Sequence, residues 1–597
     1  MKTRLPVIIC LTGLMIGIGF CSPSRAEDKL RVRSVSITGN DVYDQARLQR
    51  LMLTVPSGFL RRVRFFPEIL ADDCANLIAF YQDNGYLEAR IADTTVTIDS
   101  LDRSVSVQIA LNEGERTFVD TIGLSGNTIF TADELLSSVG LSPGEPYRRS
   151  ALQRGMLNIV ARYGARGYVD AAVKPDVTLD SLNHRVSVAL RVTEGKPATI
   201  RDIRTEGLSH TRSHVVMREL AFARGDTARP ARLLESQRRL YRTNLFKSVF
   251  LRLQPAPDST ATERDVLIEC TEAETGAFNA AIGYGSVERV SGRVEIATRN
   301  LMGTARQIGL SLAASRISRS IEGSFTEPWT FGTRWRTDLS ALYGFLDEPG
   351  YEAERWMVRS VLGRQIGRNT NIALALRTEN AILRNVMTDE TPKDVGSNTR
   401  SLTASLRYDT RDNFFAPAHG FYGEWINEVA GALLGGTNSF TRTVIRGKGF
   451  VSVARATVLG SSVELGWIGF LGGADSIPLN ERFYAGGPLS LRGFDYQSVG
   501  PLSESDAPLG GRYKLVWTVL EIRQVIYKMF GAAAFFDLGN VWSHADAISL
   551  SDLRTAAGIG LRAGTPIGIV RIDFAVNLDP RGDEPPNRWH IAAGHAF

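Results

Sequence analysis

The feature that most constrains the fold is an alternation of apolar and polar residues in a chain that has no long apolar run beyond its first 26 residues. Over residues 570–578 every even position is apolar, whereas the odd positions carry two charges and an amide. After residue 26 no stretch approaches the roughly 18 consecutive apolar residues that a membrane-spanning helix needs. Any part of the mature chain that crosses a membrane is therefore expected to be a closed β-barrel, which pairs its backbone polar groups between strands.

Residues 1–26 have the pattern of a secretory signal peptide, which indicates export. Lys2 and Arg4 precede an apolar run from Leu5 to Phe20, and Ser24 and Ala26 supply the small residues that signal peptidase needs. Alternation alone also fits a soluble sandwich, but export, the lack of another membrane anchor and the terminal Phe597 favour a barrel with its apolar face toward lipid. At about 20 residues per strand and turn, residues 276–597 form about 16 antiparallel strands.

Composition argues against several other classes of function. The 69 Lys and Arg against 64 Asp and Glu leave a net charge of +5, too evenly spread for a nucleic-acid partner. The histidines lack metal-ligand spacing, apart from His210 and His214, which have no cysteine nearby, so no metal and no other cofactor is expected. Cys74 and Cys270 lie in separate domains and are not expected to form a disulfide. No Gly-x-Ser-x-Gly motif is present, so no catalytic residue is expected.

The N-terminal half repeats itself about every 80 residues. Each unit opens with a short strand that ends in glycine, and its amphipathic helix ends at a Gly or Asn that suits a left-handed C-cap. Two alternating strands follow, and the unit closes on a glutamate. The strand glycines are Gly39, Gly126 and Gly207, the C-cap residues are Gly85, Gly167 and Asn244, and the glutamates are Glu113, Glu194 and Glu272.

The order of elements in each unit is therefore β-α-α-β-β, an α+β sandwich with helices on one face of a small sheet. Such a unit resembles a POTRA domain, the periplasmic module of outer-membrane assembly and secretion proteins. The expected divisions are a signal peptide at 1–26, three POTRA units at 29–116, 117–200 and 201–275, and an outer-membrane β-barrel of 16 antiparallel transmembrane strands at 276–597.

A set of short motifs follows in the barrel region. Each is a common turn or strand by itself, but their order is specific. They are Asn300-Leu-Met-Gly303, Thr326-Glu-Pro-Trp329, Asp409-Thr-Arg-Asp-Asn413, Tyr484-Ala-Gly-Gly487, Leu491-Arg-Gly-Phe494, Phe535-Phe-Asp-Leu-Gly539 and Gly558-Ile-Gly-Leu-Arg562. Together they resemble the BamA/TamA family of outer-membrane assembly proteins over the whole mature chain. Three POTRA units are more similar to the TamA type than to the five-unit BamA type.

The resemblance implies a loop that folds back into the barrel lumen. The loop motif is Arg492, Gly493 and Phe494, and the implied partners on the inner wall are Asp537, Glu521 and Gly539. An arginine suits this role because its forked, permanently charged guanidinium binds carboxylates in a fixed geometry. Gly493 would let the backbone approach the wall, and Phe494 would pack against it.

A lateral seam is expected where the first and last barrel strands meet. Gly276 and Gly283 lie in the first strand, expected at 276–284, and Gly594 and Phe597 lie in the last, expected at 589–597. Glycine weakens a strand, and every other neighbouring pair is tethered by a turn, so this pairing is predicted to be the weakest.

The resemblance implies a non-enzymatic factor in the outer membrane of a Gram-negative-type bacterium, with the POTRA units in the periplasm. Unfolded outer-membrane protein clients would add a strand to a POTRA sheet edge, and would then enter the outer-membrane lipid through the seam. The alternatives are a polypeptide-secretion or lipid-transfer conduit of the same family, and an outer-membrane lipase, which the missing nucleophile motif disfavours. A periplasm-spanning partner protein or accessory lipoproteins remain open as further partners.

Overall fold

The computed structural model describes residues 30–58, 63–255, 262–386, 394–454, 456–474, 476–527, 529–565 and 568–593. The expected signal peptide, Gly594 and Phe597 lie outside these ranges. The chain divides into two compact units, which are described separately. One comprises Met1–Arg204, Ala221–Ser236 and Leu251–Leu267, and the other comprises Thr205–Leu220, Gln237–Phe250 and Ile268–Phe597. The third repeat contributes residues to both units.

Each repeat has the predicted order of one strand, two helices and two strands, and its last strand lies in the middle of a three-stranded sheet. The sheet orders are β1-β3-β2, β4-β6-β5 and β7-β9-β8. In the first two sheets the opening strand pairs in parallel with the central one. The elements are β1 (Arg31–Thr38), α1 (Gln45–Gln49), α2 (Pro67–Gln82), β2 (Arg90–Asp99), β3 (Ser104–Asn112), β4 (Phe118–Ser125), α3 (Ala132–Leu136), α4 (Arg149–Ala165), β5 (Ala172–Asp180), β6 (Arg185–Thr193), β7 (Thr199–Glu206), α5 (Ser213–Met217), α6 (Pro230–Arg242), β8 (Phe246–Pro255) and β9 (Glu263–Glu272).

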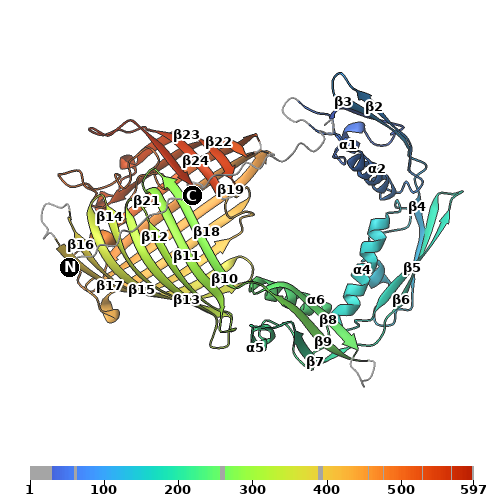
Figure 1. Ribbon diagram of the computed structural model, residues 1–597, viewed down its shortest axis with the longest axis horizontal. Coiled ribbons are helices and arrows are strands. Elements are labelled where there is room, and N and C mark those ends of the chain that lie inside the picture. The colour runs from blue at the N-terminus through green and yellow to red at the C-terminus, as the bar shows by residue number, and fades with distance from the viewer. Residues whose placement is uncertain are drawn as a thin grey trace, which may run out of the picture. The chain divides into compact units, whose positions relative to one another are not determined.

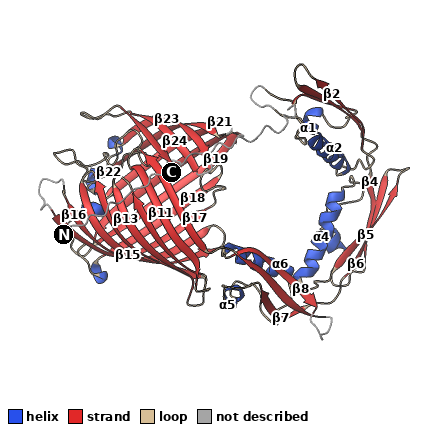
Figure 2. Ribbon diagram, viewed as in Figure 1, coloured by secondary structure: helices blue, strands red, loops and turns tan. Residues whose placement is uncertain are grey.

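In the first two repeats the long helix lies beside the sheet of its own repeat (Figure 2), and apolar side chains of the two form a buried core. In the first repeat Leu77 and Tyr81 of α2 are fully buried against Val105 and Ile109 of β3. Cys74 also packs against this core, and both Cys74 and Cys270 are free thiols. None of the helices in the described ranges is long and apolar enough to cross a membrane.

The glycine that ends each opening strand is required by its surroundings. Gly126 has a φ of +80°, and a Cβ atom there would lie 2.2 Å from the carbonyl oxygen of Val192. Gly39 and Gly207 make the same close approach to the central strand of their own repeats. Each therefore combines a left-handed backbone with a contact that leaves no room for a side chain.

The closing glutamate of each repeat binds the loop that follows the opening strand. Glu194 accepts hydrogen bonds from the backbone N–H of Ile129 (2.9 Å) and Thr128 (2.6 Å) and from the hydroxyl of Tyr163 (2.7 Å). Burial opposes ionisation, but these donors and the Thr128 hydroxyl prevail and lower the pKa of Glu194 to about 2. Glu113 likewise binds the N–H of Val42 and the hydroxyl of Tyr81.

In the third repeat, different residues contact the closing glutamate. Leu240 is fully buried, whereas its neighbour Tyr241 is 39% exposed. The Tyr241 hydroxyl accepts a hydrogen bond from the Val249 N–H instead of meeting the glutamate. Glu272 binds the hydroxyl of Ser209 (2.6 Å) in place of a tyrosine.

The barrel is one antiparallel sheet of 16 strands paired in sequence order (Figure 1). The predicted strand number and topology are confirmed. The strands are β10 (Gly276–Gly285), β11 (Arg289–Leu301), β12 (Arg306–Ala314), β13 (Ser318–Thr330), β14 (Trp335–Glu348), β15 (Tyr351–Ile366), β16 (Thr370–Arg384), β17 (Asp394–Asp409), β18 (Gly420–Ala430), β19 (Phe440–Ala454), β20 (Thr457–Phe470), β21 (Tyr513–Tyr527), β22 (Phe530–Trp542), β23 (Arg554–Thr565), β24 (Gly568–Asn577) and β25 (Asn587–Ala593).

The two faces of the barrel wall differ sharply in polarity. On β21 the apolar side chains of Trp517 and Ile522 are each 39% exposed, whereas Thr518, Glu521 and Arg523 are at most 8% exposed. The exposed face is apolar and the enclosed face is polar. This is the inverse of a soluble sandwich and the arrangement of a membrane barrel.

Two of the motifs lie at the end of the barrel where β10 begins, one at the turn that follows β11 and the other at the end of β13, and both contact residues 205–220 of the same compact unit. The Asn300 side chain donates to the Thr211 hydroxyl (2.9 Å), and the Trp329 indole N–H donates to Glu219 (2.7 Å). A Cβ at Gly303 would lie 2.1 Å from the His210 carbonyl oxygen. These contacts explain the two motifs, because they hold the ends of β11 and β13 against residues 205–220 of the third repeat.

Candidate functional site in the barrel lumen

The segment that joins β20 to β21 is described at residues 471–474 and 476–512, and its buried residues lie against the enclosed polar face of the barrel wall. Leu491, Arg492 and Phe494 are at most 3% exposed, although they belong to a connection between strands. Their partners are inward-facing residues of β21, β22 and β23. We call residues 471–512 the lumen loop.

Arg492 is held in the wall by two carboxylates. Its Nε and Nη2 each donate to Asp537 at 2.7 Å, which forms a forked pair, and its Nη1 donates to Glu521 at 2.6 Å. All three side chains are 0% exposed. The Thr518 hydroxyl donates to Asp537 as well (2.8 Å). The structure therefore brings together the arginine and both acids that the sequence singled out.

The neighbours of Arg492 explain the rest of its motif. Its guanidinium carbon lies 3.3 Å from the centre of the Phe535 ring. A Cβ at Gly493 would lie 2.6 Å from that of Ala556, so only glycine lets the loop backbone approach β23 this closely. Phe494 is buried in an apolar cluster with Ala485, Leu491, Val499, Val541 and Ala556.

Gly539 lies on β22 two residues after Asp537, so it belongs to the same face of the wall. It pairs with Val516 in the β21–β22 ladder, and a Cβ there would lie 2.2 Å from the carbonyl oxygen of Leu515. Its role is the close approach of two strands.

Further charged side chains of β21, β23 and β24 surround the Arg492 anchor. Arg523 pairs with the second oxygen of Glu521 (2.7 Å), and Arg562 pairs with Asp573 (2.5 Å). Arg571 binds Asp573 and also donates to the carbonyl oxygen of Pro488 in the loop (2.6 Å). The loop is thus held through its backbone as well as through Arg492.

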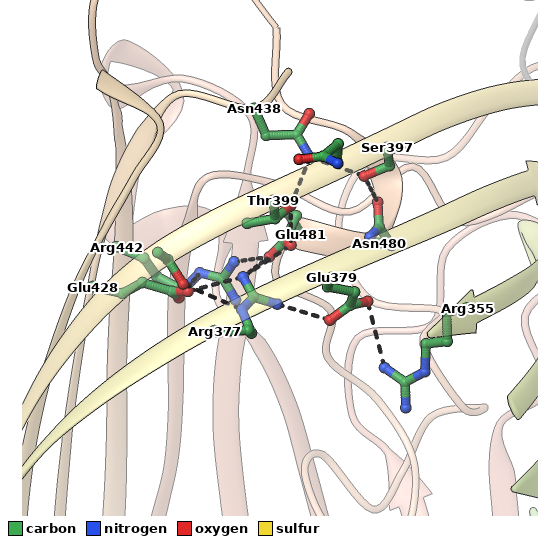
Figure 3. Close-up of polar contacts among 12 residues, drawn as sticks. Arg355, Arg377, Glu379, Ser397, Thr399, Glu428, Asn438, Arg442, Asn480 and Glu481 are labelled. Atoms are coloured by element: carbon green, nitrogen blue, oxygen red, sulfur yellow. Dashed lines mark hydrogen bonds and ion pairs between the residues drawn. The ribbon is translucent and has the colours of Figure 1, made fainter. Parts of the chain in front are cut away.

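A second anchor, which the sequence analysis missed, holds the beginning of the loop on another part of the wall (Figure 3). Glu481, in the short 3-10 helix η2 (Leu479–Glu481), is 1% exposed. It binds Arg377 of β16 (3.0 Å), the Thr399 hydroxyl of β17 (2.8 Å) and Arg442 of β19.

The surroundings of Glu481 balance its charge. Arg377 also binds Glu428 (2.8 Å) and Glu379 (3.1 Å), and Asn438 donates to the Thr399 hydroxyl (2.7 Å). The signal that sequence reasoning overlooked is an acid three residues before the Tyr484 motif, together with inward charged positions on neighbouring strands. With both anchors made, the loop links β16–β19 to β21–β24 across the lumen.

The ends of the sheet meet at a seam. The paired order runs from β10 to β25, and the Ser286 N–H, one residue beyond β10, donates to the Ile591 carbonyl oxygen of β25 (2.9 Å). Among the described residues this is the backbone hydrogen bond that joins the two end strands. Gly276 and Gly283 lie in β10, with open space at Gly276 and the Ser291 hydroxyl beside Gly283.

A cavity of about 490 Å³ lies behind the seam, between it and the lumen loop. It is lined by small residues of the first strand, including Gly283 and Gly285, by Tyr484 and Tyr496 of the loop, and by Ile591 of β25. The inner side of the seam is therefore loosely packed.

Comparison with known families accounts for both parts of the chain. Residues 300–597 match the Omp85 superfamily domain, and residues 30–114, 118–195 and 198–273 match the POTRA family, described as the surface antigen variable number repeat. The chain belongs to the BamA/TamA family. The closer likeness to the TamA type stays a prediction, because the similar proteins reported below carry the name BamA.

The outer membrane protein assembly factor BamA of Nitratidesulfovibrio vulgaris is 25% identical over 96% of this chain and 74% of its own length. BamA of Neorickettsia risticii is 24% identical over 93% of this chain and 76% of its own length. Among solved structures, BamA from Haemophilus ducreyi lacking POTRA domains 1–3 superposes with a TM-score of 0.69 and 22% identity, covering 80% of this chain and 99% of that one. At that identity the structural likeness concerns the fold.

Proposed function

We propose that this protein is an outer-membrane protein assembly factor that captures unfolded clients on its periplasmic POTRA units and inserts them through the β10–β25 seam. The observation that carries the proposal is the seam itself. Fifteen neighbouring pairs of the barrel are joined by ladders of at least seven residue pairs, whereas the described residues at the two ends of the sheet share the single backbone bond from Ser286 to Ile591. An open strand edge next to lipid is a template for an incoming strand.

The POTRA units supply a matching site for capture. Their sheet orders leave β2, β5 and β8 at an edge. An extended client can pair its backbone with such an edge strand whatever its own sequence is. Val96 and Ile98 on β2, and Val177 and Leu179 on β5, are all more than a third exposed, so these edges also offer apolar contact. A periplasm-spanning partner or an accessory lipoprotein would use the same kind of edge.

The proposed reaction needs no enzymatic step. Closure of the client barrel pairs its backbone groups, and transfer of its apolar face into lipid lowers the free energy further. The factor has only to lower the barrier, by offering a strand edge at the membrane. The lumen loop would set the shape of the barrel during this process, because its two anchors hold two separate groups of strands, β16–β19 and β21–β24.

A covalent lock tests the proposal. In a background with Cys74 and Cys270 replaced by serine, cysteines are introduced at Gly285 and Ala592, beside the Ser286–Ile591 bond. Oxidation is expected to stop insertion of a client barrel into membranes, and reduction is expected to restore it. The matched control is a cysteine pair at Val294 and Leu312, which face each other in the β11–β12 ladder.

Client insertion is measured as the fraction of client that reaches its heat-resistant, folded form. Insertion at the normal rate by the oxidised seam variant would contradict the seam mechanism. A secretion or lipid-transfer conduit through the lumen would then explain the fold better, because that route leaves the seam closed.

A further inference from the structure

His590 on β25 joins three elements that the proposed mechanism requires to move together. It is 5% exposed and faces the lumen, whereas its neighbour Trp589 is 65% exposed on the outer face. One ring nitrogen, Nε2, lies 2.7 Å from the backbone carbonyl oxygen of Arg492. The other, Nδ1, lies 3.4 Å from the hydroxyl oxygen of Ser286, just beyond β10.

The contact with the Arg492 carbonyl fixes which ring nitrogen carries a proton. A carbonyl oxygen only accepts hydrogen bonds, so Nε2 carries the proton and donates to Arg492. In the neutral ring Nδ1 is then an acceptor, which suits the Ser286 hydroxyl as donor. A neutral histidine therefore satisfies the loop and the first strand at once.

The position of these contacts matters as much as their chemistry. Arg492 is the residue that docks the lumen loop on Asp537 and Glu521, and Ser286 makes the backbone hydrogen bond across the seam. A second contact ties the same strand to the loop, because Arg588 of β25 forms an ion pair with Asp495.

We propose that His590 is a positioning residue that couples docking of the lumen loop to closure of the β10–β25 seam. When the loop is docked, the Arg492 carbonyl oxygen holds the His590 imidazole in place. Its Nδ1 then lies within hydrogen-bond distance of the Ser286 hydroxyl, which keeps β25 beside β10. When the loop leaves the wall, His590 loses its acceptor and β25 is held by fewer contacts. The inference rests on the proposed function of the seam and adds a means by which the lumen controls it.

The test measures seam opening directly, by hydrogen–deuterium exchange of the full chain in lipid nanodiscs. The amides followed are those of residues 286–287 and 587–593. His590→Phe retains a planar ring without hydrogen bonds and is expected to raise exchange there about tenfold, a typical consequence of losing one buried hydrogen bond. His590→Gln is expected to restore protection, because its amide supplies both a donor and an acceptor.

A double-variant comparison distinguishes coupling from simple loss of packing. Arg492→Ala undocks the loop but leaves the backbone carbonyl in place, so it should raise exchange at the seam by itself. If the two residues act through one link, His590→Phe adds little to the effect of Arg492→Ala. Trp589→Leu, on the same strand but facing lipid, is the matched control and should leave the difference between these variants unchanged.

Three results would overturn the inference: normal exchange in His590→Phe, additive effects in the double variant, or a His590→Gln variant as open as His590→Phe. Because the readout is exchange and not insertion, it is independent of the assembly assay. If exchange shows that loop docking and seam closure are coupled but the protein inserts no client, the proposed function is refuted and the coupling is retained.

Discussion

Removal of the Arg492 side chain is the perturbation whose size the structure defines best. Its guanidinium makes three hydrogen bonds of 2.6–2.7 Å to two carboxylates, and all three groups are 0% exposed. Removing one member of a buried ion pair costs about 3–5 kcal/mol, because it leaves uncompensated charge. Here Arg492→Ala would leave Asp537 and Glu521 facing an apolar alanine.

This free-energy cost weakens docking of the lumen loop and does not reduce the stability of the barrel. The ladders of β21 and β22 do not include Arg492, and water can reach the two acids once the loop moves away. At about 1.4 kcal/mol for each factor of ten, the docking equilibrium of the loop centre is expected to fall by about 150- to 4,000-fold. Arg492→Lys, which keeps the charge but not the fork, should give an intermediate loss.

Amide exchange of residues 491–499 measures this equilibrium, because buried amides of a local unit exchange through its undocked state. The barrel itself is checked by its heat-modifiable mobility on a gel, which should not change. Arg446→Ala is the matched control, since Arg446 also sits in a lumen ion-pair network, with Glu424 and Glu464, but on the wall alone. Exchange of residues 491–499 within threefold of the natural protein would refute the anchoring role of Arg492.

Three further predictions follow from other parts of the structure. Glu481→Gln should loosen residues 477–484 without affecting residues 491–499, because only the anchor at Glu481 loses its charge; equal loosening of both segments, measured by exchange, would show that the two anchors are not separate. The pKa of Glu194, lowered to about 2 from an ordinary 4.5, means that its ionised form stabilises the second repeat above pH 4.5 and that this stability is lost as the pH falls toward 2. Glu194→Gln should flatten that part of the pH profile of urea unfolding, followed by pulse proteolysis, and an unchanged slope would contradict it. Gly126→Ala should destabilise the same repeat by more than about 1 kcal/mol, and by more than Gly144→Ala, which has a similar φ of +83° but no atom within 4 Å of an added Cβ.

The periodic parts of the molecule were predictable because their signals are local. Alternation with a period of two marks the strands, and a Gly or Asn at the end of a helix marks a left-handed turn, as the positive φ values of Gly85, Gly167 and Asn244 show. The exposure of Tyr241 was not predictable, because Leu240 and Tyr241 both fit a helical apolar face and only packing against the sheet distinguishes them.

What the sequence determined by itself is therefore the order of the repeats and the number and direction of the barrel strands. The arginine and two acids of one lumen anchor came from the resemblance to a known family. Tertiary structure alone decided how the lumen loop crosses the barrel. Glu481 meets Arg377 over 104 positions of sequence, and His590 meets Arg492 over 98. The loop has no period from which its path could be read, and each such contact depends on which strands barrel closure places opposite one another. Closure is a property of the whole sheet, so the contacts made inside it exist only once the barrel has formed.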